Sequence, residues 1–238
     1  VGYPKGAIWE YLMTLANSNY EDWRLANPNE DIDNFKFSFS KMSKAGALFD
    51  MVKLADVSKN YICRLSAEEV YEMVTDWAKE NNKKLYKLLV DDEEYAKAIF
   101  AIERGNAKPR KDISAWTDVE NYVSYFYSEL WDRKFDFPDN LSNDDMIEIL
   151  ELYKQIYDEN VSSDDWFPQV RDMAETIGYA KAPKVYKKDP DSYKGHVGDV
   201  AGVIRVAATG RRNTPDLYEI LQVLGKDEVM KRFDEAIE

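Results

Sequence analysis

The feature that most constrains this chain is a series of helix-start signals, each followed by apolar residues at helical spacing. In the first, Ser66 and Glu69 stand three residues apart, so that hydroxyl and carboxylate can satisfy backbone amides at a helix start. Val70 and Val74 follow on one helix face. Strand patterns are nearly absent, since residues 35–39 form a single short alternating run without a hairpin partner. The sequence therefore predicts an all-α fold of helical bundles in tandem, with minimal strand.

Further helix starts repeat this pattern along the chain. They are expected at Thr117 (with Glu120), at Ser142 (with Asp145), at Ser163 or Asp164, and at Thr214. The Thr117 helix is expected to continue to Leu130, and the Ser163 helix to stop at Gly178. In the last, Thr214 is expected as the N-cap and Pro215 as the first helical residue, where the missing proline amide costs nothing.

The N-terminal stretch differs from the rest of the chain in its residue pattern. Ile8, Tyr11, Leu12 and Leu15 form a helical stripe, and a polar segment with a proline follows it. Changes in composition then favour three segments, which are 1–64, 65–180 and 181–238.

The composition excludes several classes of protein. Of 238 residues, 45% are hydrophobic and 32% charged, which is too apolar for a disordered chain and too polar for a membrane protein. One cysteine, Cys63, and one histidine, His196, exclude an internal disulfide and a Cys/His zinc site. No glycine cluster suits a phosphate-binding loop. We therefore expect no catalytic residue, no metal and a reducing, cytoplasmic location.

The chain starts with Val1 rather than Met, and no basic-then-apolar leader follows. We expect a processed chain or a piece of a longer protein, and not a secretory precursor.

The net charge of −13 conceals an asymmetry. Residues 118–165 hold fourteen acids and three bases, whereas residues 181–212 hold eight bases and three acids. Because charges act locally in salt, an acidic protein can still carry a basic face that binds nucleic acid. The alternative is that these lysines only keep a loop soluble.

Three stretches of this sequence carry motifs of a known family. Residues 41–50 start Lys-Met-Ser-Lys, and residues 11–15 read Tyr-Leu-Met-Thr-Leu. In residues 195–233, Arg205 is followed by Thr214-Pro215 and a Leu-Gly-Lys stop. These stretches resemble bacterial glutamyl-tRNA synthetases: residues 41–50 resemble a segment just beyond the catalytic domain, residues 11–15 the helix ahead of it, and residues 195–233 the end of the family. In this alignment the tetrapeptide at 41–44 only looks like the ATP-binding lysine loop, which belongs upstream of Val1.

The resemblance implies a fragment that comprises the stem-contact region and the helical anticodon-binding region. The parent enzyme would attach glutamate to tRNA with ATP and Mg, while this chain would hold no cofactor and no catalytic group. The implied partner is tRNA(Glu), with tRNA(Gln) left open, and neither a membrane nor DNA is implied.

The resemblance also implies which residues touch the RNA. Arg205 would face the anticodon bases, because arginine offers a fixed fork of donors to a base edge. Thr214, Pro215 and Leu217 would present a helix start with partial positive charge. The remaining candidates are Arg110 near the anticodon, Arg211 and Arg212 on phosphates, and Lys41 and Lys44 on the tRNA stem.

Other interpretations stay open at this point. Arg205 can instead form an internal ion pair with Asp199, and His196 can be a structural residue at a helix entrance. For the whole chain, the rivals are an acidic, all-helical scaffold for protein interactions and a free-standing RNA-binding module.

Overall fold

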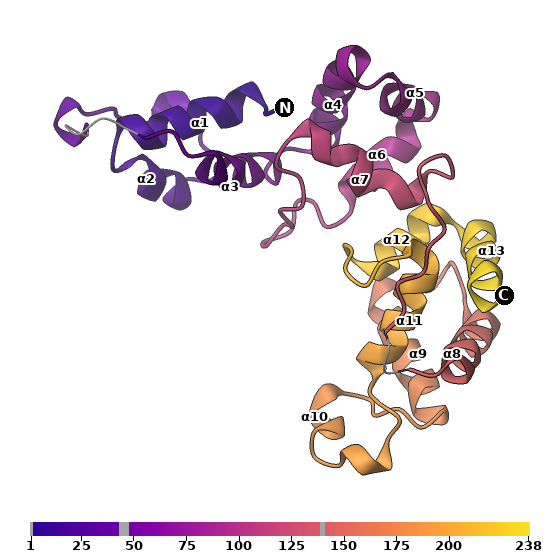
Figure 1. The fold of residues 1–238 in the computed structure, drawn as a ribbon. Helices are drawn as coiled ribbons and strands as arrows, with labels where there is room; N and C mark the ends of the chain where they lie inside the picture. Colours follow the sequence, from indigo (N-terminus) through magenta and orange to yellow (C-terminus); the bar gives the residue numbers. More distant parts are fainter. Residues whose placement is uncertain (1, 43–47, 139–140) are drawn as a thin grey trace. The chain divides into compact units, whose positions relative to one another are not determined.

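The computed structural model describes residues 2–42, 48–138 and 141–238 (Figure 1). Over these residues the chain is helical and contains no strand beyond an isolated bridge between Ala180 and His196. The all-α prediction is therefore confirmed. Within the described ranges, no helix has the length and apolar character needed to cross a membrane.

The chain folds as two compact units, Val1–Tyr127 and Ser128–Glu238. The division between Tyr127 and Ser128 falls inside the expected segment 65–180. The three segments inferred from composition stay predictions.

The first unit is built from helices joined by short loops. Its α-helices are α1 (Lys5–Ala16), α2 (Tyr20–Ala26), α3 (Met51–Ile62), α4 (Ala67–Asn81), α5 (Lys83–Asp91), α6 (Glu93–Ala101) and α7 (Val119–Val123). Its 3-10 turns are η1 (Ile32–Asn34), η2 (Phe39–Lys41), η3 (Trp116–Asp118) and η4 (Ser124–Phe126). Helix α1 packs on α3, and α4 packs on α5 and α6 (Figure 1).

One helix start of this unit is as predicted and the other is not. At α4 the Glu69 amide donates to Ser66 Oγ at 3.1 Å, and the Ser66 amide donates to Glu69 Oε2 at 2.7 Å. The start at Thr117 was wrong, because the Asp118 carboxylate accepts from the Ser114 amide at 2.8 Å. This bond closes the turn η3 ahead of α7, and α7 gives way to η4 well before Leu130.

The helical stripe expected in α1 is only partly correct. Tyr11 is fully buried, but the exposed fractions of Ile8 and Leu12 are 40% and 42%. Ala7 and Tyr11 form the buried side of α1, which packs against α3. The outer side of α1 therefore carries apolar residues that are partly exposed to solvent.

In the second unit, other helices pack around one apolar helix, α11 (Val197–Thr209). Its elements are α8 (Asn143–Ile156), α9 (Ser163–Thr176), α10 (Pro183–Tyr186), η5 (Pro190–Ser192), α11 (Val197–Thr209), α12 (Leu217–Leu224) and α13 (Lys226–Ile237). Helix α11 packs against α8, α9 and α13. Its residues Val200, Val203 and Ile204 are fully buried, as expected of a helix that is apolar on most sides.

The helix starts of this unit show one correction. Ser142 caps α8 as predicted, and α9 begins at Ser163 with Ser162 as its cap. Helix α12, however, begins at Leu217, and its N-cap is Asp216 rather than Thr214. The Asp216 carboxylate accepts from the Glu219 amide at 2.9 Å, so Thr214 lies ahead of the helix.

Candidate functional site

The structure brings together the two features that the sequence placed at the candidate site, Arg205 and the turn at 214–215. Arg205 lies on α11 and is partly exposed. Its Nη1 donates to the carbonyl of Pro215 at 2.7 Å and to the carbonyl of Thr214 at 3.3 Å. The same nitrogen donates to Thr214 Oγ1. These bonds also explain the late start of α12, because they hold the 214–215 backbone as a turn.

Asp199 serves at the start of α11 rather than beside this turn. Its carboxylate accepts from the His196 amide at 2.8 Å, and His196 Nδ1 accepts from the Gly198 amide at 3.0 Å. His196 is thus the N-cap of α11, which confirms a structural role for it at a helix entrance. Both interactions are reciprocal capping bonds of the kind that satisfy backbone amides at a helix start.

The loop between α11 and α12 starts at a glycine that no other residue can replace without strain. Gly210 has a φ of +73°, and a Cβ there would lie 2.4 Å from the carbonyl oxygen of Lys134. Further on, Arg212 donates from Nε to the carbonyl of Asp136 at 2.8 Å and from Nη2 to the carbonyl of Phe137 at 2.5 Å. Arg212 therefore ties this loop to the segment at 136–137.

Most of the predicted contact residues in this loop are buried. Leu217 is 2% exposed and Thr214 is 6% exposed, and the side chain of Pro215 is buried as well. The exposed side chains at the turn belong to Asn213 and Asp216. The sequence analysis missed Asp216, although an Asp followed three residues later by Glu is the same capping signal that it used elsewhere.

The basic side chains of residues 181–212 differ in whether a carboxylate neutralises their charge. Lys194 Nζ lies 2.8 Å from Asp145 Oδ1 and 2.9 Å from Glu148 Oε2, and these carboxylates raise the pKa of its ammonium group. Lys184, Lys187 and Lys188 are exposed, on α10 and just after it, and make no ion pair with any described residue. They form a cationic cluster, which we call the α10 lysines.

The other candidates lie in the first unit. Arg110 makes two bonds to Asp112, at 2.7 Å from Nε and 3.0 Å from Nη2, and this carboxylate raises the pKa of the guanidinium. Lys41 is exposed at the end of η2, where its carbonyl accepts from the Ser18 amide at 3.1 Å. Lys44 lies outside the residues that the structure describes.

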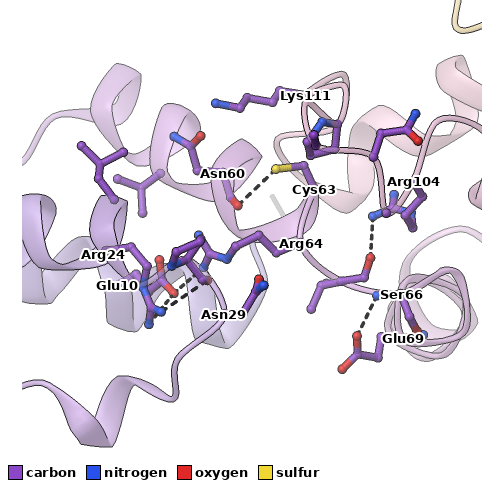
Figure 2. Close-up of a pocket in the computed structure, with 18 of the residues that line it drawn as sticks. Glu10, Arg24, Asn29, Asn60, Cys63, Arg64, Ser66, Glu69, Arg104 and Lys111 are labelled. Atoms are coloured by element: carbon purple, nitrogen blue, oxygen red, sulfur yellow. Dashed lines mark hydrogen bonds and ion pairs between the residues drawn. The ribbon is translucent and has the colours of Figure 1, made fainter.

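The first unit also contains a pocket of about 1030 Å³, which the sequence analysis did not anticipate (Figure 2). On one wall the buried Glu10 accepts ion pairs from Arg64 at 2.6 Å and Arg24 at 3.2 Å. Opposite, Arg104 donates to the carbonyls of Ile62 at 2.8 Å and Leu65 at 2.9 Å. The lining comes from α1 to α4 and residues 101–111, so no local pattern reveals it.

The pocket wall contains the lone thiol of the chain. Cys63 Sγ lies 3.3 Å from the carbonyl of Asn60, and burial raises the pKa of the thiol although Lys111 and Arg64 lower it (Figure 2). A protonated thiol is a poor nucleophile. Among residues 2–42, 48–138 and 141–238, no group of three or more His, Cys, Asp or Glu side chains is arranged to hold a metal ion.

The chain is similar to known proteins along its whole length. The model of an anticodon binding domain matches residues 191–237, which include Arg205 and the whole α11–α12 loop. The glutamate–tRNA ligase of Clostridium perfringens is 44% identical over 98% of this chain. That of Acetivibrio thermocellus is 43% identical over the whole chain. The chain spans 43% of the length of each of these relatives.

A solved structure has the same fold. It is the crystal structure of a glutamate tRNA ligase from Elizabethkingia meningosepticum in complex with its amino acid, and it is 18% identical. It aligns with 99% of this chain and 41% of its own, with a TM-score of 0.58. The chain is thus homologous, from end to end, to the C-terminal part of glutamate–tRNA ligases.

Proposed function

We propose that the chain recognises tRNA(Glu) as the C-terminal part of a glutamate–tRNA ligase. The observation that carries this proposal is the contact between Arg205 and the 214–215 turn, which lies inside the matched anticodon binding domain. The rest of the ligase would attach glutamate to the tRNA with ATP and Mg. This chain would supply affinity and identity in the cytoplasm, where tRNA is charged.

The chemistry of Arg205 suits an unstacked base. Anticodon bases are single-stranded, and proteins read such bases through hydrogen bonds to their edges and through stacking. The turn fixes the guanidinium through Nη1, so less side-chain entropy is lost when this planar group meets a base edge or a base face. Thr214 and Pro215 then act mainly by positioning Arg205, because their own side chains are buried.

We assign the phosphate contacts to cations of the second unit. The α10 lysines belong to the same compact unit as Arg205, and they are exposed. Arg211 and Arg212 follow the end of α11 and flank the site. Such contacts bind any RNA sequence and weaken with salt, whereas Arg205 would distinguish bases.

The first unit holds the remaining candidates for contact with the tRNA. We assign Lys41 and Lys44 to the inner stem and keep Arg110 as a further candidate near the anticodon. Arg110 is held by Asp112 in a bidentate pair, so a contact with RNA has to compete with that carboxylate.

Binding of three transcripts to the whole chain tests the proposal. We expect tRNA(Glu) to bind more tightly than the same tRNA with a changed anticodon, and the affinity to fall with salt. A tRNA(Gln) transcript shows whether the second substrate is accepted. The isolated chain should show no glutamate-dependent ATP–pyrophosphate exchange.

Two results would contradict the proposal. Equal affinity for tRNA(Glu) and for the same tRNA with a changed anticodon would show that this chain does not recognise the anticodon bases. An absence of binding even at low salt favours the rival function, an acidic scaffold for protein interactions.

A further inference from the structure

The outer side of α1 is an apolar face that is partly exposed among the described residues. Ile8, Trp9 and Leu12 lie next to one another on the helix, and their exposed fractions are 40%, 63% and 42%. The twelve residues of α1 include only two charged ones, Lys5 and Glu10. We call Ile8, Trp9 and Leu12 the outer face of α1.

Glu10 does not make this helix polar. Its side chain is buried, and its carboxylate is held by Arg24 and Arg64 inside the first unit. Lys5 is therefore the one charged residue of α1 that solvent reaches. A helix with apolar residues on opposite sides is expected to lie between two packed layers, and a surface helix normally carries charge on its outer side.

One of the two layers is present. On its inner side α1 packs on α3 through Ala7 and Tyr11, both fully buried. The ring of Tyr11 also meets Phe49 edge-on, with 5.1 Å between ring centroids, and Phe49 is itself 56% exposed. The inner side of α1 is thus packed against α3 and the residues just before it.

The relatives indicate what forms the second layer. This chain corresponds to the C-terminal part of ligases, of which it spans 43%, so most of each relative precedes the matched region. Helix α1 is the first element after the start of that region, and a preceding domain would meet the chain beside it. We propose that the outer face of α1 packs against the preceding part of the ligase polypeptide. This inference depends on the homology and not on the proposed RNA recognition.

Leu25 provides a matched control. It is 76% exposed, but it lies on α2 among the charged residues Glu21, Asp22 and Arg24. A single exposed apolar residue among charges is ordinary for a soluble surface, whereas contiguous apolar residues indicate an interface.

Hydroxyl-radical footprinting, read by mass spectrometry, tests the proposal. It compares the chain alone with a hybrid in which the preceding part of the Clostridium perfringens ligase is joined to its N-terminus. We expect Trp9 and Leu12 to be oxidised several-fold more slowly in the hybrid, with Leu25 unchanged. Trp116, which is 4% exposed, should be protected in both and reports that this part is folded.

Two outcomes of the footprinting overturn the proposal. One is equal oxidation of Trp9 in both proteins. The other is protection of Trp9 in the chain alone that increases with protein concentration, since a second copy would then cover the face.

Charge substitutions in the chain alone give an independent test. Trp9→Lys and Leu12→Lys should leave its urea midpoint nearly unchanged, because these side chains are 63% and 42% exposed in the chain by itself. A lower midpoint in both variants would place the face in the chain's own core and overturn the proposal.

Discussion

Arg205 donates a hydrogen bond to the carbonyl of Pro215 at 2.7 Å and thereby holds a turn that lies ten residues further along the chain. Its Nη1 also reaches both the carbonyl and the hydroxyl of Thr214. Arg205 is therefore a structural residue of the α11–α12 loop as well as the proposed reader of a base. The structural role predicts an effect on stability, and the base-reading role predicts an effect on tRNA affinity.

Arg205→Ala should reduce both stability and RNA recognition. Loss of the charged hydrogen bonds to the turn should lower the free energy of unfolding by about 1.5–3 kcal/mol. Loss of the base contact should weaken binding of the cognate tRNA by about 1–3 kcal/mol. Urea unfolding and filter binding measure the two effects.

Thr214→Val separates these two roles. Valine keeps the volume of threonine but removes the hydroxyl that accepts from Arg205. We expect a loss of stability with a smaller change in tRNA affinity than in Arg205→Ala. Unchanged affinity in Arg205→Ala, once the folded fraction is matched, would refute base reading by this residue.

Asp216→Ala should destabilise the second unit by about 1 kcal/mol, because the cap on the Glu219 amide is lost. Asp216→Asn is the control, since asparagine caps about as well as aspartate. Chemical denaturation checks both variants. An equal loss in the two would show that the negative charge matters rather than the cap.

Replacing Lys184, Lys187 and Lys188 together by glutamine should weaken tRNA binding and reduce its salt dependence. Three phosphate contacts on single-stranded RNA correspond to a change of about 2 in the slope of log K against log salt. The control is Lys194→Gln, because Asp145 and Glu148 already hold that ammonium. An unchanged slope in the triple variant would exclude the α10 lysines from the interface.

Trp131→Leu should destabilise the second unit strongly. The guanidinium carbon of Arg232 lies 4.0 Å from the centroid of the Trp131 ring, and Arg232 is 1% exposed. Loss of a desolvated cation–π contact is expected to cost at least about 2 kcal/mol. Urea unfolding measures the loss, with Trp9→Leu as an exposed control that should change little.

Asp118 should make the stability of the first unit depend on pH at the acid end. Burial would raise the pKa of its carboxyl, but hydrogen bonds from Ser114 and Ala115 outweigh burial and lower that pKa. The folded state then holds fewer protons than the unfolded state, so this stabilisation is present above about pH 4, the ordinary aspartate value, and is lost below it.

Asp118→Asn tests this pH dependence. The difference in unfolding free energy between wild type and variant should be larger at pH 7 than at pH 3. The control is Asp191→Asn, an exposed residue of η5. A difference that does not change with pH would show that the charge of Asp118 is not involved.

Sequence patterns were sufficient where a structural feature depends on neighbouring residues. The Ser66–Glu69 box was predictable because capping joins groups three residues apart, and the same holds for Ser142 with Asp145. The stop of α12 at Gly225 follows from the conformation that glycine tolerates, since its φ is +75°. Thus helix content and most helix starts were accessible from the sequence.

Local patterns failed where a distant group decided the outcome. Thr214 carries an ordinary capping signal, yet Asp216 caps α12, because Arg205 on another helix binds the Thr214 hydroxyl. Likewise, the expected stripe of Ile8, Tyr11, Leu12 and Leu15 has the spacing of a core face, but of these four only Tyr11 is fully buried, together with Ala7.

For this protein the sequence alone determined that the chain is helical and that its charge is unevenly distributed, since both follow from residue type and spacing. The resemblance of residues 195–233 to a known family singled out Arg205 together with the 214–215 turn. The tertiary structure decided that Arg205 holds that turn, that Leu217 is buried and that α1 exposes an apolar face. These properties depend on which side chains meet across helices, and only the packing of the whole chain sets those distances.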